Sequence, residues 1–187
     1  MRILILRLIL VFLFSTISES LTLSQTPPPD NSIYYDGGVY SCKISPPSGW
    51  VLDIDNVRVD GRSAAAYPRD QRYYDASMII YIWIYKSDSL EFRKKITLDS
   101  LRYLKKDSSL TFKKIDSMKI SGGRQAYLLI TTDPGGKYKL GAAAYIDAGT
   151  EMIVCELNIS DRVYFVDAET KLYEMLKKFS ASPRKDY

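Results

Sequence analysis

The chain has 187 residues, 46% of them hydrophobic and 26% charged, and its 26 basic and 22 acidic residues leave a formal net charge of +4. This charge is too small to indicate a nucleic-acid partner, and the length suits one domain with a sizeable core. Histidine is absent, which removes the commonest general base and the commonest zinc ligand. We therefore predict a protein that is not an enzyme and has no catalytic residue, metal or cofactor. An enzyme built on a pair of carboxylates is the alternative.

Residues 1–20 have the pattern of a secretory signal peptide. Arginines near the start precede an apolar run from Leu8 to Phe14, and Ser18 and Ser20 are small residues of the kind that precede a cleavage site. We predict cleavage after Ser20 and a periplasmic or extracellular location for the mature chain. A membrane anchor is the alternative, but the apolar run is far shorter than the roughly twenty residues that cross a bilayer.

The remainder of the chain divides into three parts by composition. Residues 21–37 are rich in proline and polar side chains, which predicts a flexible leader. Residues 38–180 alternate between strand-like and helix-like patterns and predict one domain. Residues 181–187 then form a C-terminal tail.

Runs of alternating, β-branched or aromatic residues predict strands at residues 39–45, 50–54, 63–67, 78–85, 111–118, 124–132, 138–146 and 151–159. The strongest strand, Met78–Tyr85 (MIIYIWIY), is apolar on both faces, so both faces must be covered. Turn residues at Asp133–Gly136 (DPGG) indicate a hairpin between two of the later strands. Because strands joined by hairpins are antiparallel, we predict a mainly antiparallel sheet.

Two helices are predicted. The first falls within residues 89–107, and its apolar residues lie on two sides. They are Leu90, Leu98, Leu101 and Leu104 on one side, and Phe92, Ile96 and Tyr103 on the other. The second helix has Asp161 as its N-cap, and its apolar residues recur every three or four positions from Phe165 to Phe179. One face of this helix is expected to pack on the sheet.

A central strand that is apolar on both faces requires a covering layer on each side. The predicted fold class is therefore α+β, a three-layer α/β/α sandwich with a mainly antiparallel sheet. The run Tyr40–Trp50 (YSCKISPPSGW), a strand that leads into P-x-x-GW, resembles the opening of the PsbP-like fold, and the order of elements over residues 38–180 is similar to that family. The resemblance implies a non-enzymatic binding or assembly protein that works by contact. It assigns no residue a catalytic role.

The two cysteines, Cys42 and Cys155, are far apart in sequence, which excludes a closely spaced metal-binding pair. Each shares its strand face with apolar residues, so both are expected to point into the core. In an oxidising compartment this pattern predicts one disulfide between them. Two buried free thiols are the alternative.

The loop Tyr67–Asp75 (YPRDQRYYD) contains several tyrosines and arginines, which are favoured in protein contacts. We predict that Arg69, Arg72, Tyr73 and Tyr74 form an exposed surface that binds a protein of the cell envelope. The alternative is that the tyrosines only pack the loop.

Basic residues concentrate around the first predicted helix. They are Arg93, Lys94, Lys95, Arg102, Lys105, Lys106, Lys113 and Lys114. Because Glu91, Asp99 and Asp107 are interleaved with them, we expect a solvated face of mixed charge. The alternative is peripheral binding of an anionic lipid or a cell-wall polymer through this basic helix.

Three aspartates cluster in the segment Asp53–Asp60 (DIDNVRVD), namely Asp53, Asp55 and Asp60. Their spacing does not fit a calcium-binding EF-hand loop, which needs a glycine in register and a late glutamate. We therefore expect solvated loop carboxylates in this segment rather than a cation site.

Overall fold

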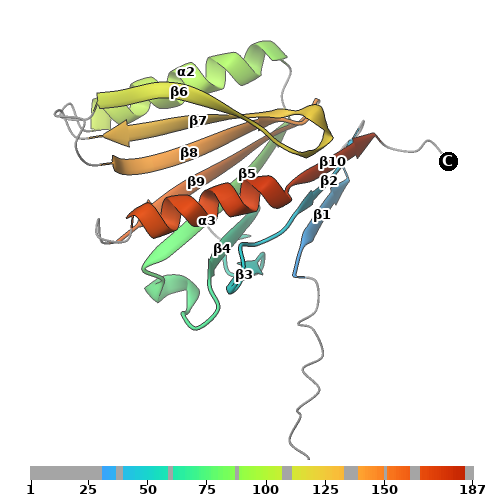
Figure 1. Cartoon of the computed structure of the whole chain (residues 1–187), viewed down its shortest axis with the longest axis vertical. Helices are drawn as coiled ribbons and strands as arrows, with labels where there is room; N and C mark the ends of the chain where they lie inside the picture. Colours follow the sequence, from blue (N-terminus) through green and yellow to red (C-terminus); the bar gives the residue numbers. More distant parts are fainter. Residues whose placement is uncertain are drawn as a thin grey trace, which may run out of the picture. The chain divides into compact units, whose positions relative to one another are not determined.

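The computed structural model describes residues 31–36, 40–58, 61–86, 89–106, 111–132, 139–149, 151–160 and 165–183. Within these residues, seven strands form one sheet in the order β3-β4-β5-β9-β8-β7-β6, and every neighbouring pair is antiparallel (Figure 1). The strands are β3 (Trp50–Asp53), β4 (Ala64–Pro68), β5 (Met78–Lys86), β6 (Thr111–Lys119), β7 (Gln125–Thr132), β8 (Lys139–Asp147) and β9 (Glu151–Ile159). Each lies within one residue of the predicted bounds.

A second sheet of three antiparallel strands has the order β1-β2-β10. Its strands are β1 (Ile33–Asp36), β2 (Tyr40–Ile44) and β10 (Ser180–Pro183). The predictions of a flexible leader up to residue 37 and a tail from residue 181 are therefore wrong where β1 and β10 lie. Both strands exist because they pair with β2, and this long-range pairing leaves no periodic signal in such short segments.

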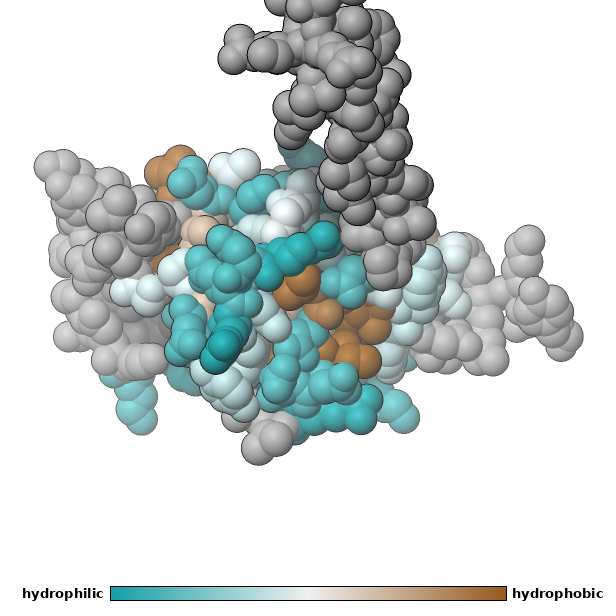
Figure 2. All heavy atoms as spheres, turned by 90° about the horizontal axis from the view of Figure 1, so that it is seen from below, coloured by the Kyte–Doolittle hydropathy of each residue, from teal (hydrophilic) through white to brown (hydrophobic). Residues whose placement is uncertain are grey.

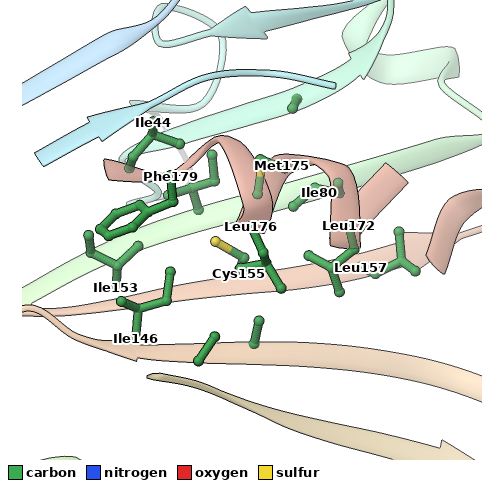
Figure 3. Packing of buried hydrophobic residues seen from close by; sticks show 14 of the residues in the cluster. Ile44, Ile80, Ile146, Ile153, Cys155, Leu157, Leu172, Met175, Leu176 and Phe179 are labelled. Carbon is green, nitrogen blue, oxygen red and sulfur yellow. The ribbon is translucent and has the colours of Figure 1, made fainter. Parts of the chain in front are cut away.

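Helix α3 (Phe165–Lys178) covers one face of the large sheet (Figure 1). Its buried residues Leu172, Met175 and Leu176 are spaced by three and four positions, so they form a single stripe. Figure 3 shows this stripe packing on the sheet beside Ile80 and Ile153, with Phe179 following the helix. The amphipathic pattern read from the sequence is confirmed, whereas Asp161, the predicted N-cap, lies outside the described residues.

Helix α2 (Ser89–Lys106) lies on the opposite face of the large sheet. Phe92 and Ile96 are buried against Tyr145 and Val154, which alternate along their strands with the residues that face α3. The three-layer α+β fold with an antiparallel sheet is thus confirmed. No helix in the described part of the chain is long and apolar enough to cross a membrane.

The turn between β2 and β3 is tied to α3 by a network that we call the α3 clamp, formed by Ser48, Lys171, Glu174 and Lys178. The backbone N–H of Ser48 donates to Oε1 of Glu174 at 2.7 Å, and Nζ of Lys178 donates to the same oxygen at 2.8 Å. Nζ of Lys171 donates to the carbonyl of Ser48 at 3.0 Å and to Oε2 of Glu174 at 3.3 Å. The clamp therefore gives the P-x-x-GW segment a structural task, which is to hold α3 in place.

Candidate functional site

The segment that follows β4 forms a well-tethered loop, residues 69–77, which contains the short helix η2 (Tyr73–Asp75). The N–H of Arg69 donates to the carbonyl of Gly49 at 3.0 Å. Inside the loop, Oε1 of Gln71 accepts hydrogen bonds from both the N–H and the hydroxyl of Ser77, at 2.8 and 3.2 Å. These bonds hold the two ends of the loop beside β3 and β5, so the backbone that carries its exposed side chains is held in place.

The structure places the four predicted contact residues in two environments. Arg69, Arg72 and Tyr74 are exposed, and Tyr74 has 79% of its surface open to solvent. Tyr73 is only 8% exposed, so the prediction of an exposed side chain is wrong for this residue. Its ring belongs to a small core together with Tyr67 and other apolar residues, because a tyrosine at the start of η2 turns inward over the sheet.

Tyr74 begins a line of four aromatic side chains that continues through Tyr73 and Tyr81 to Trp83, which we call the aromatic row. Successive ring centroids lie 4.9, 6.5 and 6.0 Å apart, and the rings are tilted or edge-on to one another. Such offset geometry is the favourable one for aromatic pairs. The row joins the loop to the face of the sheet on which α2 packs.

Arg62 lies across the aromatic row. Its guanidinium carbon is 3.8 Å from the ring centroid of Tyr81 and 5.8 Å from that of Trp83, and Nη1 donates to the hydroxyl of Tyr73 at 3.4 Å. A cation at this distance from a ring face is attracted by its quadrupole. Arg62 therefore contacts three of the four rings of the aromatic row and places a positive charge beside them.

A pocket of about 90 Å³ opens at the far end of the row, between α2 and the sheet. Its lining residues are Trp83, Tyr85, Lys95, Asp99, Arg102, Tyr145, Val154 and Glu156. The pocket thus brings together two basic and two acidic side chains with three aromatic rings. At this volume the pocket is far smaller than the roughly 300–1,000 Å³ of a typical small-molecule site.

Asp99 is the buried carboxylate of this pocket, with an exposed fraction of 6%. One oxygen accepts from Nζ of Lys95 and the other from the hydroxyl of Tyr145, both at 3.1 Å. The bond to Tyr145 joins α2 to β8, so Asp99 helps to hold the helix on the sheet. Burial raises the pKa of neighbouring Tyr85, and the charges of Asp99 and Glu156 raise it further against the opposing effect of Arg102.

The aspartates of the loop after β3 are placed as structural groups. Oδ1 of Asp53 accepts from the N–H groups of Asp55 and Asn56, both at 3.0 Å, and Oδ2 accepts from the hydroxyl of Tyr67 at 2.8 Å. Burial opposes the charged form, but a bond of 2.6 Å from the side-chain amide of Asn56 to Oδ2, together with these bonds, outweighs it and lowers the pKa of Asp53. Asp60 lies outside the described residues, within which no cluster of acidic or cysteine side chains is placed to hold a metal ion.

Cys42 and Cys155 are buried free thiols, so the predicted disulfide is wrong. Burial raises the pKa of Cys42, and Arg124 and Glu151 also act on it, lowering and raising it respectively. Glu151 begins β9, whereas Cys155 stands four residues further along that strand, a rise of about 13 Å. The two thiols face the same core from different sheets. Burial raises the pKa of Cys155 to about 12.

The sequence analysis did not single out Arg62, Tyr81 or Trp83. A signal for the two aromatic residues is present in β5, where one parity carries isoleucines and the other carries Tyr81, Trp83 and Tyr85. Because successive side chains of a strand point to opposite faces, these three aromatic residues share one face of β5 and the isoleucines at positions 80, 82 and 84 share the other. No comparable signal exists for Arg62, which precedes a strand of small residues.

No family model matches the sequence, and a search of curated proteins finds no match. Among solved structures, the chain is similar to the solution structure of cyanobacterial PsbP (CyanoP) from Synechocystis sp. PCC 6803. The TM-score is 0.49 and the sequence identity 11%, over 85% of this chain and 97% of the other. The fold class assigned here rests on the strands, helices and register of the chain itself.

Proposed function

We propose that this protein is a non-enzymatic binding protein that acts by contact with another protein of the cell envelope. The contact surface that we assign is the exposed rim Arg69, Arg72 and Tyr74, together with the aromatic row behind it. The observation that carries the proposal is the position of Tyr74. Tyr74 is 79% exposed, and its ring lies edge-on to that of Tyr73 with the centroids 4.9 Å apart, so it presents a large apolar group to solvent.

The surroundings of Tyr74 reduce the cost of binding. A partner that covers it needs to order few side chains, because the loop is tethered and Tyr73 is locked in the core. Tyrosine and arginine dominate the energetics of many protein contacts, since they combine area with a polar group. Figure 2, which views the structure from the end where β3 and β4 lie in Figure 1, shows a mainly hydrophilic surface with a hydrophobic patch.

The proposal also places the working chain outside the cytoplasm. Its support is the pattern of residues 1–20, with basic residues, an apolar run and small residues in the order that a signal peptidase reads. The intact mass of exported protein tests this part directly. A mass that begins at Leu21 supports it, and a mass that retains Met1 contradicts it.

The contact surface is tested by affinity capture from the envelope fraction of the source organism, with the captured proteins quantified by mass spectrometry. The bait is compared with the variants Tyr74→Ala and Arg72→Ala, and with Tyr34→Ala as a matched control. Tyr34 is another exposed tyrosine, 69% open to solvent, on β1. We expect one captured protein to be reduced about tenfold or more by Tyr74→Ala and to be unchanged by Tyr34→Ala. Equal capture by all baits would remove this surface as the contact site.

A further inference from the structure

The outward side of α2 carries a line of four residues that we call the outer stripe, namely Lys94, Leu98, Leu101 and Lys105. They are spaced by four, three and four positions, so they lie one above the other along the helix. Leu98 and Leu101 are 52% and 57% exposed, and both lysines are exposed. The stripe extends over about 16 Å at the rise of an α-helix.

Most of the charge that the described side chains place beside the outer stripe is positive. Arg93 and Arg102 are exposed on its two sides, which with the two lysines makes four cations, although Arg102 also lines the pocket between α2 and the sheet. Asp99, which the sequence analysis counted as an interleaved negative charge, is turned to the inner side and bonded to Lys95 and Tyr145. Glu91 is then the one exposed carboxylate among the described side chains of α2. Among the described side chains this face is therefore mainly basic, with Glu91 as its exposed carboxylate and two leucines at its centre.

From this arrangement we infer that α2 binds the surface of a membrane rich in anionic phospholipid, with the outer stripe facing the lipid. Long lysine side chains at both ends of the stripe can reach the headgroups while the leucines between them enter the apolar boundary. Clusters of four or more basic residues on a helix are the usual means of attracting an anionic leaflet. The inference is independent of the protein contact proposed for Tyr74, which lies outside α2.

An acidic protein is the competing occupant, and the shape of the stripe disfavours it. Helices that dock into protein grooves present apolar anchors over two or more turns, whereas Leu98 and Leu101 are one pair among the described side chains of this side of α2. Cations at both ends of that pair match a diffuse negative surface better than a closed apolar groove. The membrane is therefore the occupant to which the observations point.

The experiment is sedimentation of the full chain with phosphatidylcholine vesicles, with and without about 30% phosphatidylglycerol. Two double variants test the stripe, Lys94→Glu/Lys105→Glu for its charge and Leu98→Gln/Leu101→Gln for its apolar part. Lys119→Glu/Lys177→Glu is the matched control, because it changes the net charge equally at two exposed lysines on other elements. Every protein carries the same residues 1–20, so any binding by that apolar run is common to all, and circular dichroism checks that each variant is folded.

We expect the anionic vesicles to bind the wild-type chain at least tenfold more tightly than the neutral ones, with an additional loss as salt is raised from about 0.05 to about 0.5 M. The charge variant should lose about tenfold and the leucine variant about threefold or more, while the control keeps most of the binding. Equal binding to both vesicle types, an equal loss in the control, or unchanged binding by the leucine variant would each overturn the inference. Binding of soluble polyglutamate as tight as that of the anionic vesicles would assign the face to an acidic protein instead.

Discussion

The carboxylate of Glu174 accepts most of the hydrogen bonds of the α3 clamp. The effect of removing its charge on the stability of the protein can therefore be estimated from the structure. Replacing Glu174 by glutamine keeps the shape of the side chain and removes its charge. Burial disfavours the charged form of Glu174, but hydrogen bonds from Lys178, Ser48 and Lys171 outweigh it and lower the pKa from 4.5 to about 2. The ionised form is therefore bound more tightly in the folded protein than in the unfolded chain.

The magnitude follows from linkage between ionisation and folding. A shift of this size corresponds to at most about 3 kcal/mol of unfolding free energy at neutral pH. Because the side chain of Glu174 is 27% exposed, solvent screens part of this, and we expect the glutamine variant to lose about 1–2 kcal/mol. The folded-state pKa is depressed, so the stabilisation is fully present above about pH 4.5 and is lost as the pH falls toward about 2.

Urea unfolding followed by circular dichroism measures the effect. Glu174→Gln should be less stable than the wild type at pH 7, and the difference should shrink below about pH 4.5. Lys178→Met should also destabilise, whereas Lys177→Met at the neighbouring exposed position serves as the matched control. If Glu174→Gln unfolds like the wild type at pH 7, or if the same deficit persists near pH 2, the reasoning about the clamp is refuted.

Three other predictions concern buried polar groups and thiols. Asp99→Ala should lower the free energy of unfolding by about 2–3 kcal/mol, because the hydroxyl of Tyr145 and the ammonium of Lys95 lose the carboxylate that they contact. Urea unfolding measures this, and an unchanged stability would contradict the prediction. Cys42 and Cys155 should both titrate with a thiol reagent in denaturant without reductant, and a result of no reactive thiol would show a disulfide. In the native protein Cys155 should react very slowly, because its pKa is raised to about 12. Tyr67→Phe should cost about 1 kcal/mol and remove a phenol that ionises at about pH 12 in an absorbance titration. Because that pKa is raised above 10, the stabilisation from Tyr67 is present below about pH 10 and is lost toward pH 12, so an unchanged titration curve would count against this assignment.

The sequence by itself determined the strands of the large sheet, their antiparallel pairing and the packing face of α3. These features follow from periodicities of two and three to four residues, which are properties of the local chain. The apolar character of both faces of Met78–Tyr85 also determined that the sheet is covered on each side. The described structure bears this out, with α3 on one face and α2 on the other.

Only the tertiary structure decided which side of α2 is buried. Both sides carry apolar residues in the sequence, and the choice depends on how Phe92 and Ile96 fit the facing strands rather than on hydrophobicity alone. The same choice exposes Leu98 and Leu101 and turns Asp99 inward. The basic outer face of the helix is thus a consequence of packing, and it cannot be predicted by counting the charges along the chain.

Long-range partners decided the remaining features. β1 and β10 are strands because β2 lies between them, Tyr73 is buried because it packs against Tyr67 and Tyr81, and the two cysteines, which lie in different sheets, are free thiols. In each case the residues that decide the outcome lie close together in space but far apart along the chain, so the local pattern does not contain them. Local patterns report the face on which a residue lies, and its position along that face is set by the register between distant strands.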